Sequence, residues 1–392
     1  MGIHKLMTLI QEKAPKAIKQ VHMDMLTGKV VACDASMAIY QFLIATQGFS
    51  KSGNPGLFEL KDVDGNLTGH LVGLYHRTIQ FMEAGVKPIW VFDGKPPDLK
   101  AHELDKRKES KENAEEQKEK AIESGDWEKV KQMAGRSIKI TPEMMSDAKK
   151  LVRLMGCPIV EAPCEAEAQC AMIVKHGLAF ATATEDMDCL TFGTNFMIRG
   201  LNSKKEPLTQ IELKVMLEQF EMTMDEFVDL CILCGCDYTK NIGGIGPVKA
   251  FKFVKDHSTI EKVLESIAED ALDEKKKVKY IVPSDFRYVE SRALFNAPDV
   301  IEDKAELEKQ IKWMKPDEDG LKEFLVGSKG FTEQKVDTGL KKLAGAQTKV
   351  NQSRLDCFFK SAGTSQSKMP APVKKGAKDT RKSAGAKPGK GK

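Results

Sequence analysis

Acidic side chains gather after several apolar segments, and they are the residues of this sequence best suited to chemistry. The stretch ATATEDMDCLTFG, residues 181–193, places Glu185, Asp186 and Asp188 directly after a short apolar run. Carboxylates this close together repel one another, so they persist either in a loop well exposed to water or around a positive charge. Two interpretations are therefore open for this stretch, a hydrated turn or part of a cation site.

Three apolar runs end in acid in the same way, at residues 28–36, 87–95 and 177–188. Continuous apolar runs of this length are typical of buried parallel strands, and helical patterns such as residues 70–85 lie between them. Strands that alternate with helices predict an α/β fold, with a central twisted and mostly parallel sheet and helices on both faces.

The acids that follow these runs are expected to meet at one edge of the sheet, where the carboxyl ends of parallel strands lie. Asp34, Asp93, Asp186 and Asp188 all have this position. Each of them alone is explained as well by a turn or by a helix cap. Because the arrangement recurs at three strands, the sequence favours a shared site.

Two further acidic segments are expected to join that site. A helix within residues 162–177 carries Glu165 and Glu167 in its first turn. Side chains two residues apart on a helix point about 200° from each other, so one glutamate would bind a cation directly and the other obliquely or through water. Asp237 ends an apolar helix predicted over residues 224–235. The plain alternatives are acids that decorate a helix start and an aspartate that caps a helix.

Together these acids favour a pair of hard divalent cations. The candidate ligands are Asp34, Asp93, Glu165, Glu167, Asp186, Asp188 and Asp237. So many carboxylates remain ionised in one crevice only if cations neutralise them. A donor set made of oxygen, without His or Cys, selects Mg²⁺ or Mn²⁺ over zinc. Two such ions about 3.5 to 4 Å apart support phosphodiester hydrolysis, so the predicted substrate is a nucleic acid or another phosphate ester.

Residues 98–150 are dense in Lys and Glu and have little apolar stripe, so they are predicted to be helical without forming core. The plain interpretation is a solvated helical hairpin. In the order of the chain, however, this segment stands between the second acid-bearing strand and the glutamate helix. It would then rise over the proposed site, where Lys100 and Arg107 could meet phosphates.

A glycine-rich turn offers a second contact for phosphate. The stretch NIGGIGPVKAFKFVKDH, residues 241–257, joins glycines to Pro247 and a basic amphipathic helix that carries Lys249 and Lys252. Free amide groups at such a turn can hold a backbone phosphate. A glycine-rich turn alone is a weak signal, and its nearness to Asp237 strengthens it.

The C-terminal segment combines an aromatic motif with a basic tail. Residues 351–360 read NQSRLDCFFK, with the spacing Q-x-x-L-x-x-F-F formed by Gln352, Leu355, Phe358 and Phe359. Adjacent aromatics in a polar linker favour insertion into a partner's pocket over a stray core turn. Residues 361–392 carry nine basic residues against one acid and are predicted to be disordered. The tail has a net charge of +8 and the whole chain only +4, so residues 1–360 carry a net charge of −4. Nucleic-acid binding by residues 1–360 therefore needs local basic patches.

Composition excludes several classes of protein. No stretch approaches the roughly 20 apolar residues of a membrane span, and the start lacks a secretory signal, so an intracellular protein without a membrane partner is expected. Nine cysteines without an export signal predict reduced thiols that pack as small hydrophobes. Cys231, Cys234 and Cys236 lack the further ligands that a zinc site needs.

Several of these segments together resemble one family, the structure-specific 5′ nucleases, over almost the whole chain. The motifs are DASMAIYQFLIA, VFDGKPPDLK, EAEAQCA, ATEDMDCLTFG and FVDLCILCGCDY followed by GGIGPVKA. The resemblance implies the PIN-like 5′ nuclease fold, with a helical arch over the active site and a helix-two-turn-helix at about residues 225–257. The implied regions are an N-terminal nuclease region at 1–111, the arch and its connecting helices at 98–150, an internal nuclease region at 129–262, a C-terminal part of the core at 263–345, a clamp-binding peptide at 351–360 and the basic tail at 361–392.

The resemblance also implies roles for single residues. The family's counterparts of the seven acids hold two Mg²⁺ ions, for which Mn²⁺ can substitute, and those of Lys100 and Arg107 engage the scissile phosphate. The counterpart of Tyr40 stacks on a base, and the glycine hairpin at residues 243–249 grips duplex DNA with a bound K⁺. The implied DNA contacts are Tyr40, Arg77, Glu165, Gly235, Asp237, Gly244, Gly246 and Lys249.

The implied activity is cleavage of branched DNA near the base of a 5′ flap, with a weaker 5′ to 3′ exonuclease activity, in Okazaki fragment maturation and long-patch base excision repair. Residues 352–359 would bind the replication sliding clamp PCNA, and the protein would act as a monomer in the nucleus and also in mitochondria. The alternatives are a related 5′ to 3′ repair exonuclease, an RNA-acting nuclease and a non-catalytic clamp-binding scaffold. The chain departs from the family pattern at His4 and Lys5, in the long loop at residues 46–66, and at Cys164, where a Ser is usual.

Overall fold

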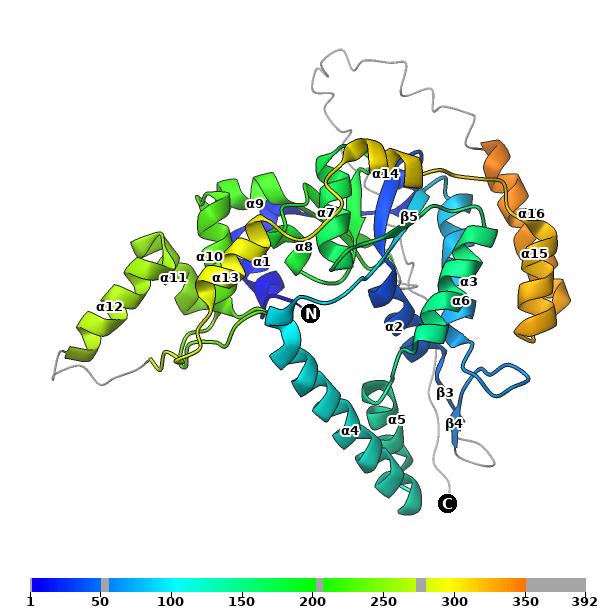
Figure 1. The fold of residues 1–392 in the computed structure, drawn as a ribbon, viewed down its shortest axis with the longest axis horizontal. Coiled ribbons are helices and arrows are strands. Elements are labelled where there is room, and N and C mark those ends of the chain that lie inside the picture. The colour runs from blue at the N-terminus through cyan, green and yellow to red at the C-terminus, as the bar shows by residue number, and fades with distance from the viewer. Residues whose placement is uncertain (1, 51–55, 202–206, 273–279, 350–392) are drawn as a thin grey trace, which may run out of the picture. The chain divides into compact units, whose positions relative to one another are not determined.

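A seven-stranded sheet organises the part of the chain described by the computed structural model, which comprises residues 2–50, 56–201, 207–272 and 280–349 (Figure 1). Its strand order is β1-β9-β8-β7-β2-β5-β6. The strands are β1 (Ile18–Val21), β2 (Val30–Asp34), β5 (Lys87–Phe92), β6 (Ile159–Glu161), β7 (Ala181–Ala183), β8 (Phe196–Arg199) and β9 (Leu208–Glu212). The strands from β8 to β6 run parallel, while β9 pairs antiparallel with β8 and β1, so the prediction of a mostly parallel sheet is confirmed.

The three acid-bearing runs form neighbouring strands at the centre of this sheet. In the parallel register Ala32 of β2 lies between Ile89 of β5 and Thr182 of β7, and all three side chains are buried. Helices cover both faces, so the strands have no solvated side and read as unbroken apolar runs. The three predicted strands are confirmed, and each is shorter than the apolar run from which it was predicted.

Successive side chains of β2 and β5 point to opposite faces of the sheet. Val31, Cys33, Trp90 and Phe92 belong to the core beneath one set of helices. That set comprises α2 (Ala35–Thr46), α3 (Gly69–Glu83), α6 (Pro142–Leu154), α15 (Glu318–Lys322), the π-helical turn η4 (Glu323–Ser328) and α16 (Glu333–Lys349).

The opposite face of the central strands packs against α7 (Ala166–Lys175) and α14 (Lys304–Gln310). Ala32, Ile89 and Val91 meet Cys170 and Ile173 of α7 there. Helices therefore cover both faces, as the sequence predicts (Figure 1).

A second apolar core holds the helices on the side of β8 and β9. They are α1 (Leu6–Lys13), α8 (Asp188–Thr191), α9 (Leu213–Phe220), α10 (Met224–Cys234), α11 (Pro247–His257), α12 (Ile260–Leu272) and α13 (Tyr288–Asn296). α10 begins with a capping box between Thr223 and Glu226 and packs against α11. The pair occupies the part of the chain in which a helix-two-turn-helix is expected. The short remaining elements are η1 (Pro15–Ala17), η2 (Met23–Leu26), and the hairpin of β3 (Gly48–Ser50) and β4 (Gly56–Phe58).

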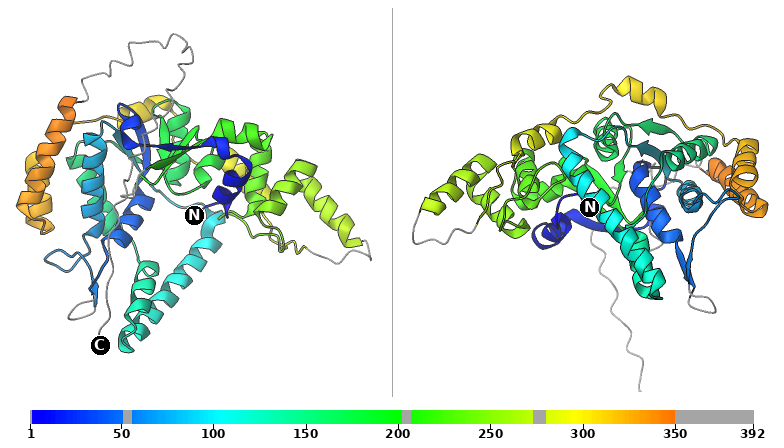
Figure 2. Two further views of the ribbon diagram at one scale, coloured as in Figure 1. Left: turned by 180° about the vertical axis from the view of Figure 1, so that it is seen from behind. Right: turned by 60° about the horizontal axis from the view of Figure 1, so that its bottom comes forward.

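The charged segment forms an arch of two helices that lie side by side and project from the sheet (Figures 1 and 2). Its helical elements are η3 (Asp98–Lys100), α4 (Ala101–Glu123) and α5 (Trp127–Arg136). In α4 only Ala114 and Ala121 are buried, so the prediction of a helix outside the core is confirmed there. The same prediction is wrong at the end of the segment, because Met144 and Ala148 of α6 belong to an apolar stripe that packs into the main core.

Three sequence expectations concern the chain as a whole. No helix among the described residues is long and apolar enough to cross a membrane. The eight cysteines of the described segments are all free, as expected of reduced thiols. The clamp-binding motif of Gln352, Leu355, Phe358 and Phe359 and the basic tail lie outside the described residues, and the predicted boundaries between nuclease regions stay predictions.

Candidate active site

A cavity of about 940 Å³ lies at the carboxyl ends of the central strands, beneath α4. Six of the seven candidate acids lie in its wall, together with Glu103 of α4; the six are Asp34, Asp93, Glu165, Glu167, Asp186 and Asp237. Asp188 lies directly behind them, because its backbone N–H donates a hydrogen bond of 3.1 Å to Oδ1 of Asp186. The structure thus brings all seven candidate acids together from the end of β2, the residue after β5, the start of α7, the segment from the β7–α8 turn to the first residue of α8, and the turn after α10.

Asp34, at the end of β2, and Asp93, directly after β5, line the cavity and also cap helices. The interpretation as a helix cap and the interpretation as part of a shared site are therefore both correct for these residues. Asp34 is the N-cap of α2 and accepts hydrogen bonds from the backbone N–H of Met37 at 2.9 Å and from the hydroxyl of Thr184 at 3.0 Å. Asp93 accepts the backbone N–H of Ala166, the first residue of α7, at 2.8 Å. These hydrogen bonds fix one oxygen or both and orient each carboxylate toward the cavity.

The expected place of Glu165 in the first turn of the helix is wrong. Glu165 is the N-cap of α7, with φ −97° and ψ 134°, so it stands outside the helix while Glu167 lies in the first turn. Because the extended N-cap turns its side chain independently of the helical periodicity, both side chains line the cavity, and the expectation that only one of them binds a cation directly stays a prediction. Lys100 forms an ion pair with Glu165, and its Nζ lies 4.0 Å from Oε1 of Glu167.

Lys100 and Arg107 are the basic side chains of the arch that meet these acids. The Nζ of Lys100 also lies 3.4 Å from Oδ2 of Asp237, and Arg107 donates a hydrogen bond of 2.7 Å to the same oxygen. Burial alone would lower the pKa of Lys100, but the charges of Glu167, Glu165 and Asp237 outweigh it and raise that pKa. The predicted placement of both side chains over the acids is confirmed, because each of them pairs with at least one of these carboxylates.

Burial makes several of the carboxylates difficult to ionise. It is the largest cause of a rise in the pKa of Asp34 to about 7, to which Asp93 adds, and it also raises the pKa of Glu167, Asp186 and Asp188. A cation reverses this effect because it favours the charged form.

Asp188 shows most directly that these acids suit a cation. Its side chain is 0 % exposed, and neither carboxylate oxygen has a hydrogen-bond partner in the structure. Oxygen donors of this kind suit a hard divalent ion such as Mg²⁺ or Mn²⁺. Among the described residues no three His, Cys, Asp or Glu side chains already form a metal-binding arrangement, and the ammonium of Lys100 lies between Glu165, Glu167 and Asp237 instead.

Two residues of the site carry no signal of charge and were missed from the sequence. Gly2 lines the cavity with φ +69°, and a Cβ there would lie 2.0 Å from Oδ1 of Asp186 and 2.3 Å from Oδ1 of Asp188. Tyr238 donates its hydroxyl to Glu165 from beneath the acids. The only available signals were the MGI start and the position of Tyr238 next to Asp237.

The departure at His4 and Lys5 leaves the start of the chain attached to the site. The backbone N–H of His4 donates a hydrogen bond of 3.0 Å to the carbonyl of Gly235, and both residues line the cavity. Gly235 has φ +111°, and a Cβ on it would come within 2.7 Å of the Asn241 side chain, so glycine is needed there.

The predicted DNA contacts divide into three groups. Tyr40 and Gly235 line the cavity with Glu165 and Asp237. Gly244, Gly246 and Lys249 lie outside it, in the turn before α11 and on its first turn, where the ammonium of Lys249 donates to the Gly244 carbonyl at 2.8 Å. Arg77 is 7 % exposed, hydrogen-bonds Gln80 at 3.0 Å and is absent from the cavity wall, so the structure does not bring it to the acids.

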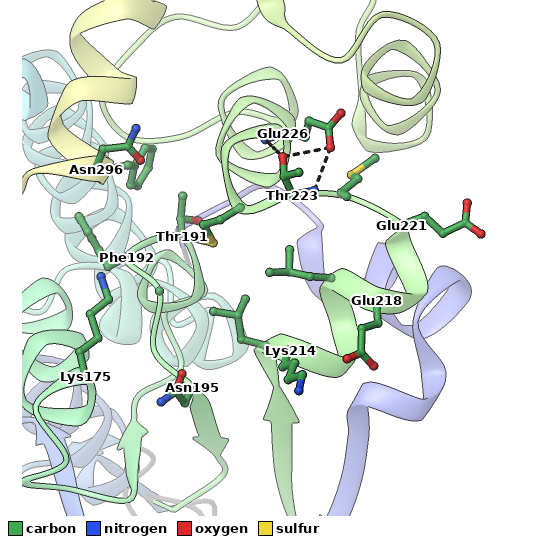
Figure 3. A pocket seen from close by; sticks show the side chains of 16 residues that line it. Lys175, Thr191, Phe192, Asn195, Lys214, Glu218, Glu221, Thr223, Glu226 and Asn296 are labelled. Carbon is green, nitrogen blue, oxygen red and sulfur yellow. Dashed lines mark hydrogen bonds between the residues drawn. The ribbon is translucent and has the colours of Figure 1, made fainter.

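A second cavity, of about 740 Å³, lies at the opposite ends of helices that carry site residues (Figure 3). Lys175 ends α7 and Thr191 ends α8, while Thr223 and Met224 mark the start of α10. No candidate metal ligand lines this cavity. The acids of the first cavity therefore define the candidate active site.

Known proteins share this organisation. Family models described as the XPG N-terminal domain and the XPG I-region match residues 1–114 and 156–237. Flap endonuclease 1 of Tetrahymena thermophila is 50% identical over 361 residues, which cover 92% of each chain. Flap endonuclease 1-1 of Paramecium tetraurelia is 49% identical over 394 residues, 99% of this chain and 100% of that one.

The chain belongs to the flap endonuclease family. Among solved structures it is similar to flap endonuclease-1 from Methanococcus jannaschii, with a TM-score of 0.61 and 30% identity over 85% of this chain and 96% of that chain. The resemblance seen in the sequence is thereby confirmed, and so is the 5′ nuclease fold. In this family member the seven acids, Lys100 and Arg107 all fall within the two matched regions.

Proposed function

We propose that this chain is a structure-specific 5′ flap endonuclease with 5′ to 3′ exonuclease activity, which removes 5′ flaps in Okazaki fragment maturation and long-patch base excision repair. The observation that carries this proposal is the meeting of seven acids from five segments under two basic side chains of the arch. A non-catalytic clamp-binding scaffold has no physical need for such a cluster.

Two Mg²⁺ ions are the proposed cofactors, held by Asp34, Asp93, Glu165, Glu167, Asp186, Asp188 and Asp237, with Mn²⁺ able to replace them. Bound there, the ions supply an activated water and stabilise the leaving oxygen. The unpartnered oxygens of Asp188 and the all-oxygen donor set support this assignment. A K⁺ ion at the turn of residues 243–249 is proposed on the family resemblance.

The arch residues position the substrate in this proposal. Lys100 pairs with Glu165, and Arg107 pairs with Asp237. A phosphate that enters the cavity would compete with these carboxylates for the two basic side chains. In this proposal Lys100 and Arg107 would exchange their carboxylate partners for the oxygens of the scissile phosphate. We assign base stacking to Tyr40, and its position on the cavity wall supports this role.

Beyond the cavity, duplex DNA would be bound through its backbone. The glycine turn before α11 offers backbone N–H groups and Lys249 to a phosphate. Such contacts fix the position of the duplex and carry no sequence information, which suits an enzyme that selects structure.

One assay tests the activity. Labelled 5′ flap, 3′ flap, blunt duplex and RNA flap substrates are incubated with Mg²⁺ or with EDTA, and the cut position is mapped. We expect cleavage only with Mg²⁺, near the base of the 5′ flap. Equal cutting of blunt duplex or of RNA would favour a related exonuclease or an RNA nuclease, and cutting in EDTA would overturn the metal assignment.

A matched pair of variants tests the site in the same assay. Asp186→Ala should abolish cleavage and leave flap binding measurable, whereas Asp225→Ala, at an exposed acid of α10, should cleave like the parent. Full activity of Asp186→Ala would remove this residue from the metal site.

We also propose that residues 352–359 bind the sliding clamp PCNA, that the protein is a monomer, and that it works in the nucleus and also in mitochondria. Replacing Phe358 and Phe359 with Ala should weaken clamp binding in a pull-down and leave basal cleavage unchanged. Replacing Lys374 and Lys375 in the tail is the matched control. An unchanged clamp affinity of the aromatic variant would refute the peptide assignment, and light scattering measures the oligomeric state.

A further inference from the structure

We propose that Tyr238 is a positioning residue that holds Glu165 in its metal-binding orientation when Lys100 turns from the acids to the DNA phosphate. This inference rests on the proposed nuclease function and assigns a role to a side chain that is not a metal ligand. Tyr238 follows Asp237 directly in the chain, and its side chain is 2 % exposed.

The carboxylate of Glu165 is shared between two donors. Its Oε1 accepts the ammonium of Lys100, and its Oε2 accepts the hydroxyl of Tyr238. The donors come from the base of the arch and from the turn after α10, so the plane of the carboxylate is fixed from two directions. The Nζ of Lys100 also lies 5.9 Å from the centroid of the Tyr238 ring, within the range of a cation–π contact.

The ring of Tyr238 is itself held firmly. It packs edge-on against Phe295 of α13, with the centroids 5.1 Å apart and an interplanar angle of 68°. Phe295 in turn packs against Phe192, at 5.3 Å, immediately after the one-turn helix α8 that begins with Asp188. A ring placed between the acids and this aromatic core has little freedom to move, so its hydroxyl is a fixed donor.

The two donors of Glu165 have different fates in the catalytic cycle. Lys100 carries a charge that a phosphate attracts, so it leaves Glu165 when the substrate arrives. Tyr238 carries no charge that a phosphate would attract, and its ring is packed against Phe295, so its hydroxyl stays at Glu165. The Tyr238 hydrogen bond is therefore the one that remains to orient Glu165 toward the cation.

Loss of such a partner is felt first in metal binding. Groups that hydrogen-bond a metal ligand typically contribute 10- to 100-fold to metal affinity or activity. Tyr238→Phe removes the hydroxyl and keeps the ring that packs on Phe295. We expect it to weaken Mn²⁺ binding by roughly 10-fold or more and to slow single-turnover cleavage by a similar factor.

Tyr75→Phe is the matched control. Tyr75 is also a buried tyrosine, and its hydroxyl donates one hydrogen bond of 3.0 Å to the carbonyl of Val336, in the core beneath α3 and α16. Each substitution removes one buried hydroxyl, so the two should lower stability by similar amounts. Only the Tyr238 variant should change the metal site.

The experiment measures three properties of the full chain. Mn²⁺ binding without DNA is followed by electron paramagnetic resonance, flap binding is measured in Ca²⁺, and single-turnover cleavage is measured over a range of Mg²⁺ concentrations. For Tyr238→Phe we expect weaker Mn²⁺ binding, flap affinity within about twofold of the parent, and a rate partly rescued by high Mg²⁺. Tyr75→Phe should match the parent in all three.

Two outcomes overturn the inference. One is a folded Tyr238→Phe that binds Mn²⁺ and cleaves like the parent, and the other is an equal loss in both tyrosine variants, which would indicate a general structural effect. If Tyr238→Phe does not fold, Phe295→Leu tests the same inference, because it loosens the ring and keeps the hydroxyl. A parent-like Mn²⁺ affinity and rate in that variant then overturns it. Failure of the parent to bind Mn²⁺ or to cut a flap would instead refute the proposed function.

Discussion

Arg107 of the arch helix donates a hydrogen bond of 2.7 Å to the carboxylate of Asp237, a residue 130 positions later in the chain. The side chain of Asp237 is nearly buried and that of Arg107 is about one third exposed. Burial alone would lower the pKa of Arg107, but the charge of Asp237 and the contacts with Glu103 raise it. The arch is therefore attached to the acid cluster through this pair.

Replacing Arg107 with Ala separates catalysis from binding. In the proposed mechanism the guanidinium binds the scissile phosphate, and removal of one such donor typically slows a reaction by about 10²- to 10³-fold. We expect a loss of this size in the single-turnover rate, with only a small loss of flap affinity. Lys108→Ala, one position along and exposed, is the control and should cleave like the parent. A variant with weak flap binding and a normal rate would make Arg107 an anchor.

Asp188→Asn tests whether the charge of a buried acid destabilises the folded chain until a divalent cation binds. Burial, followed by the charges of Asp186 and Asp237, raises the pKa of Asp188, and its oxygens are unpartnered, so its charged form opposes folding without metal. The amide should therefore increase the free energy of unfolding in EDTA by about 1 kcal/mol. It should also reduce the stabilisation that Mg²⁺ gives the parent.

Denaturant titrations of the parent, Asp188→Asn and Asp225→Asn, each with Mg²⁺ and with EDTA, measure both effects. Asp225 is an exposed acid of α10, so its variant should respond to Mg²⁺ as the parent does. Equal stabilisation of Asp188→Asn and the parent by Mg²⁺ would exclude Asp188 from metal binding.

Gly2→Ala should damage the site through its smallest residue. Gly2 has φ +69°, and an added Cβ would collide with Asp186 and Asp188. Both the strained backbone and the displaced carboxylates should reduce Mn²⁺ affinity and cleavage at least 10-fold. Gly327→Ala, in η4, is the control because its Cβ would meet no atom within 4 Å. Parent-like Mn²⁺ binding by Gly2→Ala would show that the start of the chain is free to move aside.

The acids were predictable from the sequence because each one follows a local pattern. An apolar run that ends in acid marks a buried strand and its carboxyl end, and β2, β5 and β7 lie side by side as such runs imply. Parallel strands share one edge, so Asp34, Asp93 and Asp186 meet there. Lys100 and Arg107 were found in the same way, through the position of a charged segment between two acid-bearing elements.

The remaining features depend on geometry that the sequence leaves open. Glu165 was misplaced because a shift of one residue in the helix start turns an in-helix side chain into an N-cap. Tyr238 and Gly2 carry no charge, so no pattern of charge or hydrophobicity distinguishes them from core and turn residues. Arg77 is one of the buried residues of α3, and the sequence pattern of that helix did not indicate that its side chain is buried.

His70 predicts a pH dependence of stability that is separate from the active site. Its side chain is 1 % exposed, and burial lowers its pKa from 6.5 to about 4. The imidazole stays neutral in the folded chain while it gains a proton in the unfolded chain, so folding is opposed as the pH falls below about 6.5. A shift of this size corresponds to a loss of about 3 kcal/mol between pH 6.5 and 4.

Other groups titrate in this range, so the measurement is a difference between two proteins. Urea unfolding of the parent and of His70→Gln at pH 7.5 and pH 4.5 should show a smaller loss of stability on acidification for the variant, by about 2 kcal/mol. His257→Gln, on the last turn of α11 and less buried, should lose stability as the parent does. If the parent and His70→Gln lose the same free energy of unfolding on acidification, the imidazole is protonated in the folded chain, and burial does not lower its pKa.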